Sequence, residues 1–204
     1  MKLHWSPRSP YVRKVMICAK EKGIEKQIEC VRSVVAMKNP NRDLMRTNPL
    51  GKIPTLVLDD GRVMFDSIVI CEYLDSLNGG PPLFPPSGAR RWEALGWHAL
   101  GDGLLDVCIL WRNERDREHP MTALLEGFEA KAWAALALLE RETGALDAAP
   151  FGIAHITIGC ALGYLDFRFA DLGWRDKHPR LAAWFAVFSE RPSVRETLPF
   201  NDVD

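Results

Sequence analysis

A short stretch rich in glycine and proline, residues 78–88, most limits how this chain can fold. It contains one Gly-Gly pair and two Pro-Pro pairs, a composition that excludes both a helix and the interior of a sheet. The segments on its two sides follow different patterns, since strands and helices alternate before it and helical spacing dominates after it. We therefore predict two domains, 1–77 and 89–204, joined by a linker.

The first domain is predicted to be a small mixed α/β unit. A tight turn at Gly61 predicts a hairpin, because glycine tolerates positive φ. The expected elements are a strand at Lys2–Trp5, a helix from Tyr11 to about Gly23, a strand within 28–35, a hairpin over 55–64 and a helix over 66–77. Beyond the linker, apolar residues recur at helical spacing over 92–117, 121–142, 153–169 and 179–192. The segment 153–169 is apolar enough to be the central helix of a bundle.

Composition and charge exclude several classes of protein. The 204 residues carry a formal net charge of −1, which gives no general attraction to nucleic acid or to an anionic membrane. We find no signal peptide, no apolar run long enough to span a bilayer, no zinc motif and no glycine-rich phosphate loop. The five cysteines are widely spaced and odd in number, so we expect buried thiols in a reducing cytoplasm and no metal.

The segment Ser6–Lys14 carries the clearest chemical signal. Ser9 lies where a strand gives way to a helix, and Pro10 stands in the first turn. The start of a helix presents unpaired N–H groups and the positive end of the helix dipole, so a thiol held there ionises more readily. Ser9 either donates a hydrogen bond to such a thiolate or merely caps the helix.

Two further segments are weak signals alone. In the first, Asn48–Leu56, Pro54 indicates a turn or the entry to a strand. A cis bond before Pro54 would expose the peptide groups of Ile53, but spacing alone does not predict one. In the second, Ser67 at an N-cap could hold a carboxylate and Asp66 an ammonium, or both could simply begin a helix.

Taken together and in order, these motifs resemble the glutathione site of cytosolic glutathione transferases of the serine type. The motifs are Ser9-Pro10-Tyr11 with Arg13-Lys14, Asn48-Pro49 with Lys52-Ile53-Pro54, and Asp66-Ser67. The helical remainder also has the family's length and layout. The resemblance implies a thioredoxin-like N-terminal domain followed by an all-α helical bundle, and a homodimer.

The resemblance also implies roles in binding glutathione. Ile53, before a cis Pro54, would pair its backbone with the cysteinyl part of the tripeptide. Lys52 would approach the glycyl carboxylate, and Asp66 and Ser67 would hold the γ-glutamyl end. Some relatives have cysteine where this chain has serine, and those favour thiol–disulfide exchange.

Ser9 would favour the glutathione thiolate, which attacks a small hydrophobic electrophile. We expect the second-substrate site to include Tyr11, Leu104, Cys108 and Trp111. The expected function is a detoxifying glutathione S-transferase with glutathione as co-substrate. The alternatives are a non-catalytic glutathione-binding or regulatory protein, and a glutathione-dependent isomerase, peroxidase or dehalogenase.

One stretch departs from the family pattern. Relatives begin the central bundle helix with a capping box, whereas this chain has Gly152 without a side-chain cap and His155 in place of the acidic partner. We expect weaker local stability there and a structural role for His155.

Overall fold

The computed structural model describes residues 1–77 and 80–202, and it divides the chain into two compact units. Unit 1 contains residues 1–86 and 192–204, and unit 2 contains residues 87–191. The predicted linker ends close to this division, although its residues 78–79 lie outside the described part. The C-terminal segment differs from our expectation, because residues 192–202 group with the α/β unit and not with the helical one.

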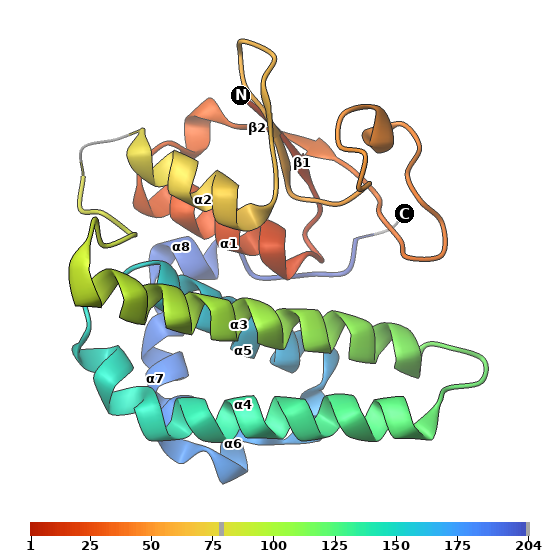
Figure 1. Ribbon diagram of the computed structural model, residues 1–204, viewed down its shortest axis with the longest axis vertical. Coiled ribbons are helices and arrows are strands. Elements are labelled where there is room, and N and C mark those ends of the chain that lie inside the picture. Colours follow the sequence, from red (N-terminus) through yellow and green to blue (C-terminus); the bar gives the residue numbers. More distant parts are fainter. Residues whose placement is uncertain (78–79, 203–204) are drawn as a thin grey trace. The chain divides into compact units, whose positions relative to one another are not determined.

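Unit 1 is built on a four-stranded mixed sheet in the order β2-β1-β3-β4. β1 is parallel to β2 and antiparallel to β3, which is antiparallel to β4. The strands are β1 (Lys2–Trp5), β2 (Glu29–Arg32), β3 (Thr55–Val57) and β4 (Val63–Met64). The helices are α1 (Pro10–Glu21) and α2 (Ser67–Ser76), with short 3-10 turns η1 (Glu25–Gln27) and η2 (Leu44–Arg46). α1 and α2 pack against each other (Figure 1).

A buried ion pair joins the C-terminal ends of α1 and α2. Lys22, just after α1, lies 3.0 Å from the Asp75 carboxylate of α2, and the two side chains are only 2% and 9% exposed. Asp75 also accepts the backbone N–H groups of Leu83 and Phe84, while Lys22 donates to the carbonyl of Pro81. The described part of the linker is therefore fixed to unit 1 by charge-assisted hydrogen bonds.

The C-terminal segment returns to unit 1 through α8 (Pro192–Arg195). The Val194 carbonyl accepts a hydrogen bond from the buried guanidinium of Arg13 on α1. Further along, the Asp202 carboxylate lies 3.1 Å from the guanidinium of Arg8. These contacts join the segment to α1 and to the loop before it.

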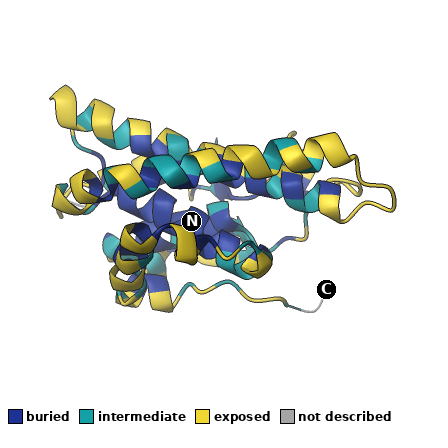
Figure 2. Cartoon of the chain, turned by 90° about the horizontal axis from the view of Figure 1, so that it is seen from below, coloured by how far each residue is buried: buried dark blue, intermediate teal, exposed yellow. Residues whose placement is uncertain are grey.

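Unit 2 consists of helices that surround one buried helix. Its elements are α3 (Gly88–Arg115), α4 (Thr122–Ala148), α5 (Ile153–Arg168), η3 (Ala170–Leu172), α6 (Trp174–Lys177) and α7 (Pro179–Ser189). Every residue of α5 from Ile153 to Leu165 is buried, so the predicted central helix is present. Exposed residues lie along the outer sides of the long helices (Figure 2). Among the described residues, no helix combines the length and apolar character needed to cross a membrane.

His155 reaches back to the start of α5, which confirms the structural role that we expected for it, while weaker local stability there stays a prediction. Its Nδ1 accepts the Gly152 N–H at 3.3 Å, and its Nε2 lies 2.9 Å from the Leu146 carbonyl. This arrangement requires the neutral ring with its proton on Nε2. Imidazole thus supplies half of a capping box in place of the usual carboxylate.

Protonation of His155 is expected to destabilise the protein. Burial, together with the nearby charge of Arg191, lowers the pKa of His155 from its ordinary value of 6.5. The stabilisation is therefore fully present above about pH 6.5 and is lost as the pH falls towards the lowered pKa, by up to about 1.4 kcal/mol per pH unit. We expect the stability advantage of wild type over His155→Asn, measured by urea unfolding, to shrink from pH 7.5 to 5.5. A stability difference between the two proteins that does not change with pH would contradict this role. The pKa of His4 is also lowered, but its contribution is the same in both proteins and cancels in the comparison.

Close contact between α3 and α5 requires glycine at position 101. A Cβ there would lie 2.8 Å from Thr157 Cγ2 and 3.1 Å from the backbone nitrogen of Ile158. Gly103, two residues later, is exposed, and a Cβ added to it would meet no other atom within 4 Å. The absence of a side chain is therefore needed for helix packing at Gly101 and is not needed at Gly103.

We expect Gly101→Ala to lower the free energy of unfolding by about 1–3 kcal/mol through overpacking. Gly103→Ala is the matched control, and it should raise stability by up to about 1 kcal/mol because alanine favours a helix. Chemical denaturation of the two variants and the wild type measures both effects. Equal effects of the two substitutions would show that α3 and α5 do not approach closely at Gly101.

Candidate functional site

Strand register brings the three predicted segments to one end of the sheet. His4 pairs with Thr55, so continuing the antiparallel register places Ile53 opposite Ser6, three residues before Ser9. Leu56 pairs with Met64, and the same continuation places Asp66 opposite Pro54. The starts of α1 and α2 therefore flank the loop before β3.

Ser9 is the N-cap of α1, and Pro10 is the first helical residue. The Ser9 hydroxyl oxygen accepts the Val12 N–H at 3.3 Å, which satisfies one of the unpaired donors of the helix. None of the described residues accepts the proton of this hydroxyl. The cap thus leaves a half-buried O–H donor at the positive end of a helix.

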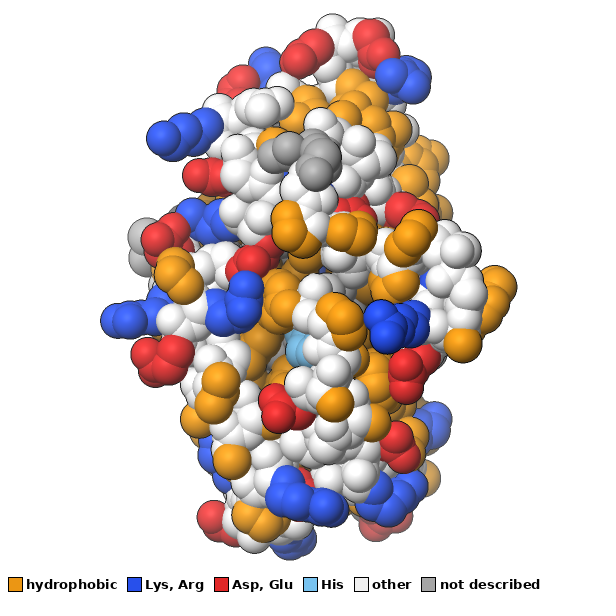
Figure 3. All heavy atoms as spheres, turned by 90° about the vertical axis from the view of Figure 1, so that its left-hand side faces the viewer, with side chains coloured by type: hydrophobic (Ala, Val, Ile, Leu, Met, Phe, Trp, Pro, Cys, Tyr) orange, Lys and Arg blue, Asp and Glu red, His pale blue; other side chains and the backbone are white. Residues whose placement is uncertain are grey.

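The charges near this donor are mainly positive. The first turn of α1 contains no acidic residue, and the next turn carries the buried side chains of Arg13 and Lys14. The Lys14 ammonium lies 5.9 Å from the centre of the Tyr11 ring. An anion at the start of α1 would gain from both the helix dipole and these cations. The surface shown in Figure 3, by contrast, mixes charges of both signs with apolar side chains.

Asn48 organises the loop that leads into β3. Its amide nitrogen donates to the Lys52 carbonyl and to the Thr55 hydroxyl, and its amide oxygen accepts the Leu50 N–H at 3.0 Å. Thr55, fully buried, also donates to the Lys52 carbonyl at 2.8 Å. Gly51 adopts a φ of 60°, which glycine tolerates without steric cost. Although Asn48 was part of the motif, sequence reasoning gave it no role, and it missed Thr55.

The peptide bond between Ile53 and Pro54 is cis, as the family resemblance implied. Within the part of the chain that the structure describes, neither the N–H nor the C=O of Ile53 has a hydrogen-bond partner. Backbone polar groups are normally paired, so this residue presents a donor and an acceptor to a partner outside the chain. Lys52, beside it, is exposed.

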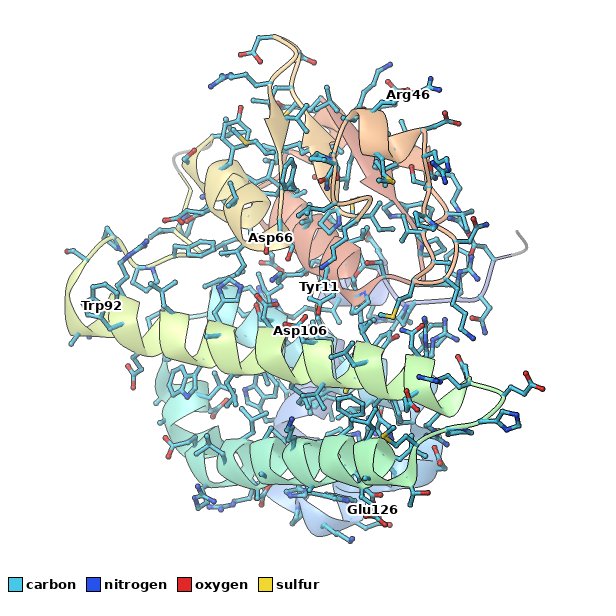
Figure 4. The ribbon with its side chains drawn as sticks, turned by 45° about the vertical axis from the view of Figure 1, so that its right-hand side comes forward. Tyr11, Arg46, Asp66, Trp92, Asp106 and Glu126 are labelled. Carbon is cyan, nitrogen blue, oxygen red and sulfur yellow. The ribbon has the colours of Figure 1, made fainter. Side chains whose placement is uncertain are left out.

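Asp66, and not Ser67, is the N-cap of α2, which corrects our assignment. The Asp66 carboxylate accepts the Ile68 N–H at 2.9 Å, and Ser67 is the first helical residue. Asp66 follows a cis peptide bond and is exposed, whereas Ser67 is buried. The Ser67 hydroxyl makes no hydrogen bond within the described residues. Figure 4 labels Asp66 and Tyr11 at the starts of α2 and α1.

Of the four residues predicted to line the second-substrate site, Tyr11 lies on α1 in unit 1 and the other three lie in unit 2. Leu104, Cys108 and Trp111 are on α3 and are 2%, 0% and 5% exposed. The indole of Trp111 stacks on the ring of Phe169 with centroids 4.5 Å apart. Burial raises the pKa of the Cys108 thiol to about 12, so this thiol stays protonated at neutral pH.

Comparison with known proteins identifies the family. The model of the glutathione S-transferase N-terminal domain matches residues 8–77, and that of the C-terminal domain matches residues 122–186. The GST-like protein YibF from Escherichia coli (strain K12) is 33% identical over 204 residues, covering 98% of each chain. The chain belongs to the glutathione S-transferase family.

Solved structures confirm the predicted fold class. A glutathione transferase family member from Pseudomonas fluorescens Pf-5, crystallised with glutathione, is 45% identical, with a TM-score of 0.95 over 98% of this chain and 99% of that chain. A second crystal structure of a family member from Pf-5 contains S-(propanoic acid)-glutathione. It is 44% identical, with a TM-score of 0.90 over 98% of this chain and 100% of that chain.

Loss of the Asn48 side chain is expected to loosen the loop before β3. Asn48→Ala removes buried hydrogen bonds and leaves their partners unpaired, so the free energy of unfolding should fall by about 2–3 kcal/mol. Asn41 is the matched control, because its amide also bridges two backbone groups (the Val34 carbonyl and the Leu44 N–H) but is exposed. Urea unfolding should give Asn41→Ala a smaller loss, and equal losses would contradict the role of burial.

Proposed function

We propose that this protein is a glutathione transferase that holds glutathione as a thiolate beside Ser9. One observation carries the proposal: the Ser9 hydroxyl has a proton that no described residue accepts, at the positive end of α1. A thiolate sulfur accepts such a hydrogen bond, and the bond together with the helix dipole lowers the pKa of the thiol. More of the bound glutathione is then in the nucleophilic form at neutral pH.

The neighbouring segments offer partners for the rest of the tripeptide. The unpaired N–H and C=O of Ile53 would bond the cysteinyl part of glutathione, as an added strand does at a sheet edge. The Asp66 carboxylate would bind the γ-glutamyl ammonium, and the Ser67 hydroxyl and N–H the γ-glutamyl carboxylate. The Lys52 ammonium would pair with the glycyl carboxylate. Together these contacts fix the sulfur near Ser9, and fixed orientation accelerates its reaction.

In the proposed reaction the thiol proton leaves to solvent and the sulfur electron pair forms a bond to an electrophilic carbon. The leaving group departs with the electron pair of its own bond, or a polarised double bond takes up the charge and then a proton. The protein forms no covalent intermediate. The residues that contact the electrophile stay a prediction, which is Tyr11 of α1 for unit 1 and Leu104, Cys108 and Trp111 of α3 for unit 2.

The relatives support this proposal for the glutathione site. Both Pf-5 family members hold glutathione or its S-substituted form, and each covers nearly the whole of this chain. The position occupied by cysteine in thiol–disulfide exchange enzymes is Ser9 here, which favours conjugation. Homodimer formation and a cytoplasmic, detoxifying role remain predictions from the family resemblance.

Removal of the Ser9 hydroxyl is expected to raise the pKa of bound glutathione and to slow turnover. Ser9→Gly removes the donor while weakening the helix cap by only a few tenths of a kcal/mol, whereas Ser9→Ala also loses about 1 kcal/mol of capping. We expect both variants to lose roughly 100- to 1,000-fold in kcat at pH 7 with a model aryl halide, as expected for one lost oxyanion-type donor. The pH–rate profile, which reports the thiol pKa, should shift to higher pH.

Ser6→Ala is the matched control, since Ser6 is a buried serine in the same loop whose hydroxyl weakly contacts the Arg8 N–H. It should retain the wild-type pH profile. An unchanged profile in Ser9→Gly would remove Ser9 from the mechanism. Retention on a glutathione matrix without turnover of a broad panel of electrophiles would favour a binding protein over a transferase.

A further inference from the structure

The Ser9 hydroxyl is carried by a tight turn between β1 and α1. The Ser9 N–H donates to the Ser6 carbonyl at 3.2 Å, which closes a β-turn with Pro7 and Arg8 at its centre. Proline suits the first central position of such a turn because its φ is already fixed. The side chains of Ser6 and Pro7 are buried, whereas Arg8 is only partly buried and reaches out of the turn.

One carboxylate connects this turn to the neighbouring strand. Asp202 Oδ1 lies 3.1 Å from Nε of Arg8, and Asp202 Oδ2 accepts a hydrogen bond from Nε of Arg32 at the end of β2. Arg32 pairs in register with Trp5, the last residue before the turn. We call these three side chains, Arg8, Arg32 and Asp202, the carboxylate clamp.

The surroundings of the carboxylate clamp make it more than an ordinary surface ion pair. The side chains of Asp202, Arg8 and Arg32 are only 17%, 29% and 30% exposed. Single exposed ion pairs contribute little, but here one carboxylate bridges two guanidinium groups and all three side chains are largely withdrawn from water. Salt screens partly buried charges of this kind less than exposed ones.

The C-terminal segment that carries Asp202 is itself fixed to α1, and its helix α8 packs against α1 (Figure 1). The Ser193 hydroxyl donates to the Glu21 carboxylate at the C-terminal end of α1, where Glu196 also pairs with Lys20. Asp202 contacts the turn before the opposite end of the same helix. The carboxylate is therefore held by its own segment, and it can hold the turn in place in return.

We propose that Asp202 is a positioning residue for the Ser9 hydroxyl, acting through Arg8 and the turn. The inference rests on the proposed function and adds to it the residue that fixes the hydrogen-bond donor. With the carboxylate clamp formed, the centre of the turn and the strand beside its start are tied together, so the N-cap of α1 has little freedom to move. A hydrogen bond to a thiolate depends steeply on distance and angle, so a loosened turn weakens it.

Charge alone predicts the opposite effect on the pKa of the glutathione thiol. A nearby carboxylate disfavours a thiolate, so removing Asp202 would lower the thiol pKa if only its charge mattered. If Asp202 holds Ser9 in place, removing it weakens the hydrogen bond to the thiolate and raises the thiol pKa. The direction of the change therefore distinguishes positioning from charge.

Asp202→Asn removes the charge with little change in shape and tests the inference. The thiol pKa of bound glutathione is measured from the ultraviolet absorbance of the thiolate across pH, and kcat and KM are measured with the model aryl halide. We expect the thiol pKa to rise and kcat at pH 7 to fall roughly 10-fold, because misplacing a catalytic group from a distance costs up to about 100-fold. The KM for glutathione should change less than about 2-fold, since the carboxylate clamp includes none of the groups proposed to bind the tripeptide.

Glu196→Gln is the matched control, because it removes the same charge from the same segment and breaks an ion pair at the other end of α1. It should keep the wild-type thiol pKa and kcat, and an equal effect of the two substitutions would overturn the inference. Thermal unfolding shows whether each variant is folded. Arg32→Gln, which breaks the other half of the carboxylate clamp, carries the test if Asp202→Asn does not fold.

The double variant Ser9→Gly/Asp202→Asn shows whether Asp202 acts through Ser9. Without the hydroxyl there is no donor left to position, so the double variant should match Ser9→Gly in thiol pKa and in kcat. Arg32→Gln is compared in the same two backgrounds, because a pure charge effect persists without the hydroxyl. Equal losses with and without the Ser9 hydroxyl would overturn the inference.

The outcomes separate this inference from the proposed function. An unchanged or lowered thiol pKa in Asp202→Asn, with a raised one in Ser9→Gly, would overturn the positioning role and leave the transferase proposal standing. A thiol pKa that Ser9→Gly leaves unchanged would overturn both, since Asp202 is proposed to act through that hydroxyl. Absence of any glutathione binding would also overturn both.

Discussion

The pairing of β3 with β1 on one side and β4 on the other is the constraint on which the glutathione site depends. Each of the three candidate segments lies directly beyond a strand of this set, so the register fixes which backbone groups face one another. A slip of one residue would turn every side chain of β3 to the opposite face and would move Ile53 away from the start of α1. The buried pair of Asn48 and Thr55 holds the loop at the entry to β3, where such a slip would begin.

The segments of the proposed glutathione site share a second property, which is that each has hydrogen-bonding groups without a partner among the described residues. The Ser9 hydroxyl proton has no acceptor, and the N–H and C=O of Ile53 have no partner, within the part of the chain that the structure describes. Folded proteins pair nearly all their polar groups, so groups of this kind indicate where a ligand completes the network. At the start of α5, by contrast, the Gly152 N–H is satisfied within the chain by Nδ1 of His155.

The sequence predicted the fold well where local physics decides the outcome. Apolar periodicity and breaker residues located the main helices, and the ordered motifs named three segments that the strand register brings to one end of the sheet. Local reasoning was wrong where neighbours compete for one role: Asp66 and Ser67 can both cap α2, and only the backbone conformation decides between them. It also missed the His155 cap, because imidazole is not a usual capping group and its second bond goes to Leu146, outside the helix.

Contacts between elements distant in the sequence could not be predicted from local patterns. This limit affects the two units differently. Unit 1 offers backbone groups and helix starts to its proposed ligand, and glycine, proline and capping residues mark such features in a sequence. Unit 2 is organised by side-chain contacts between helices, and Arg112 of α3 meets Tyr164 of α5 across one of them. No local pattern encodes such a contact. A constant co-substrate can therefore be inferred from motifs, whereas the class of a variable second substrate has to be inferred from three-dimensional contacts.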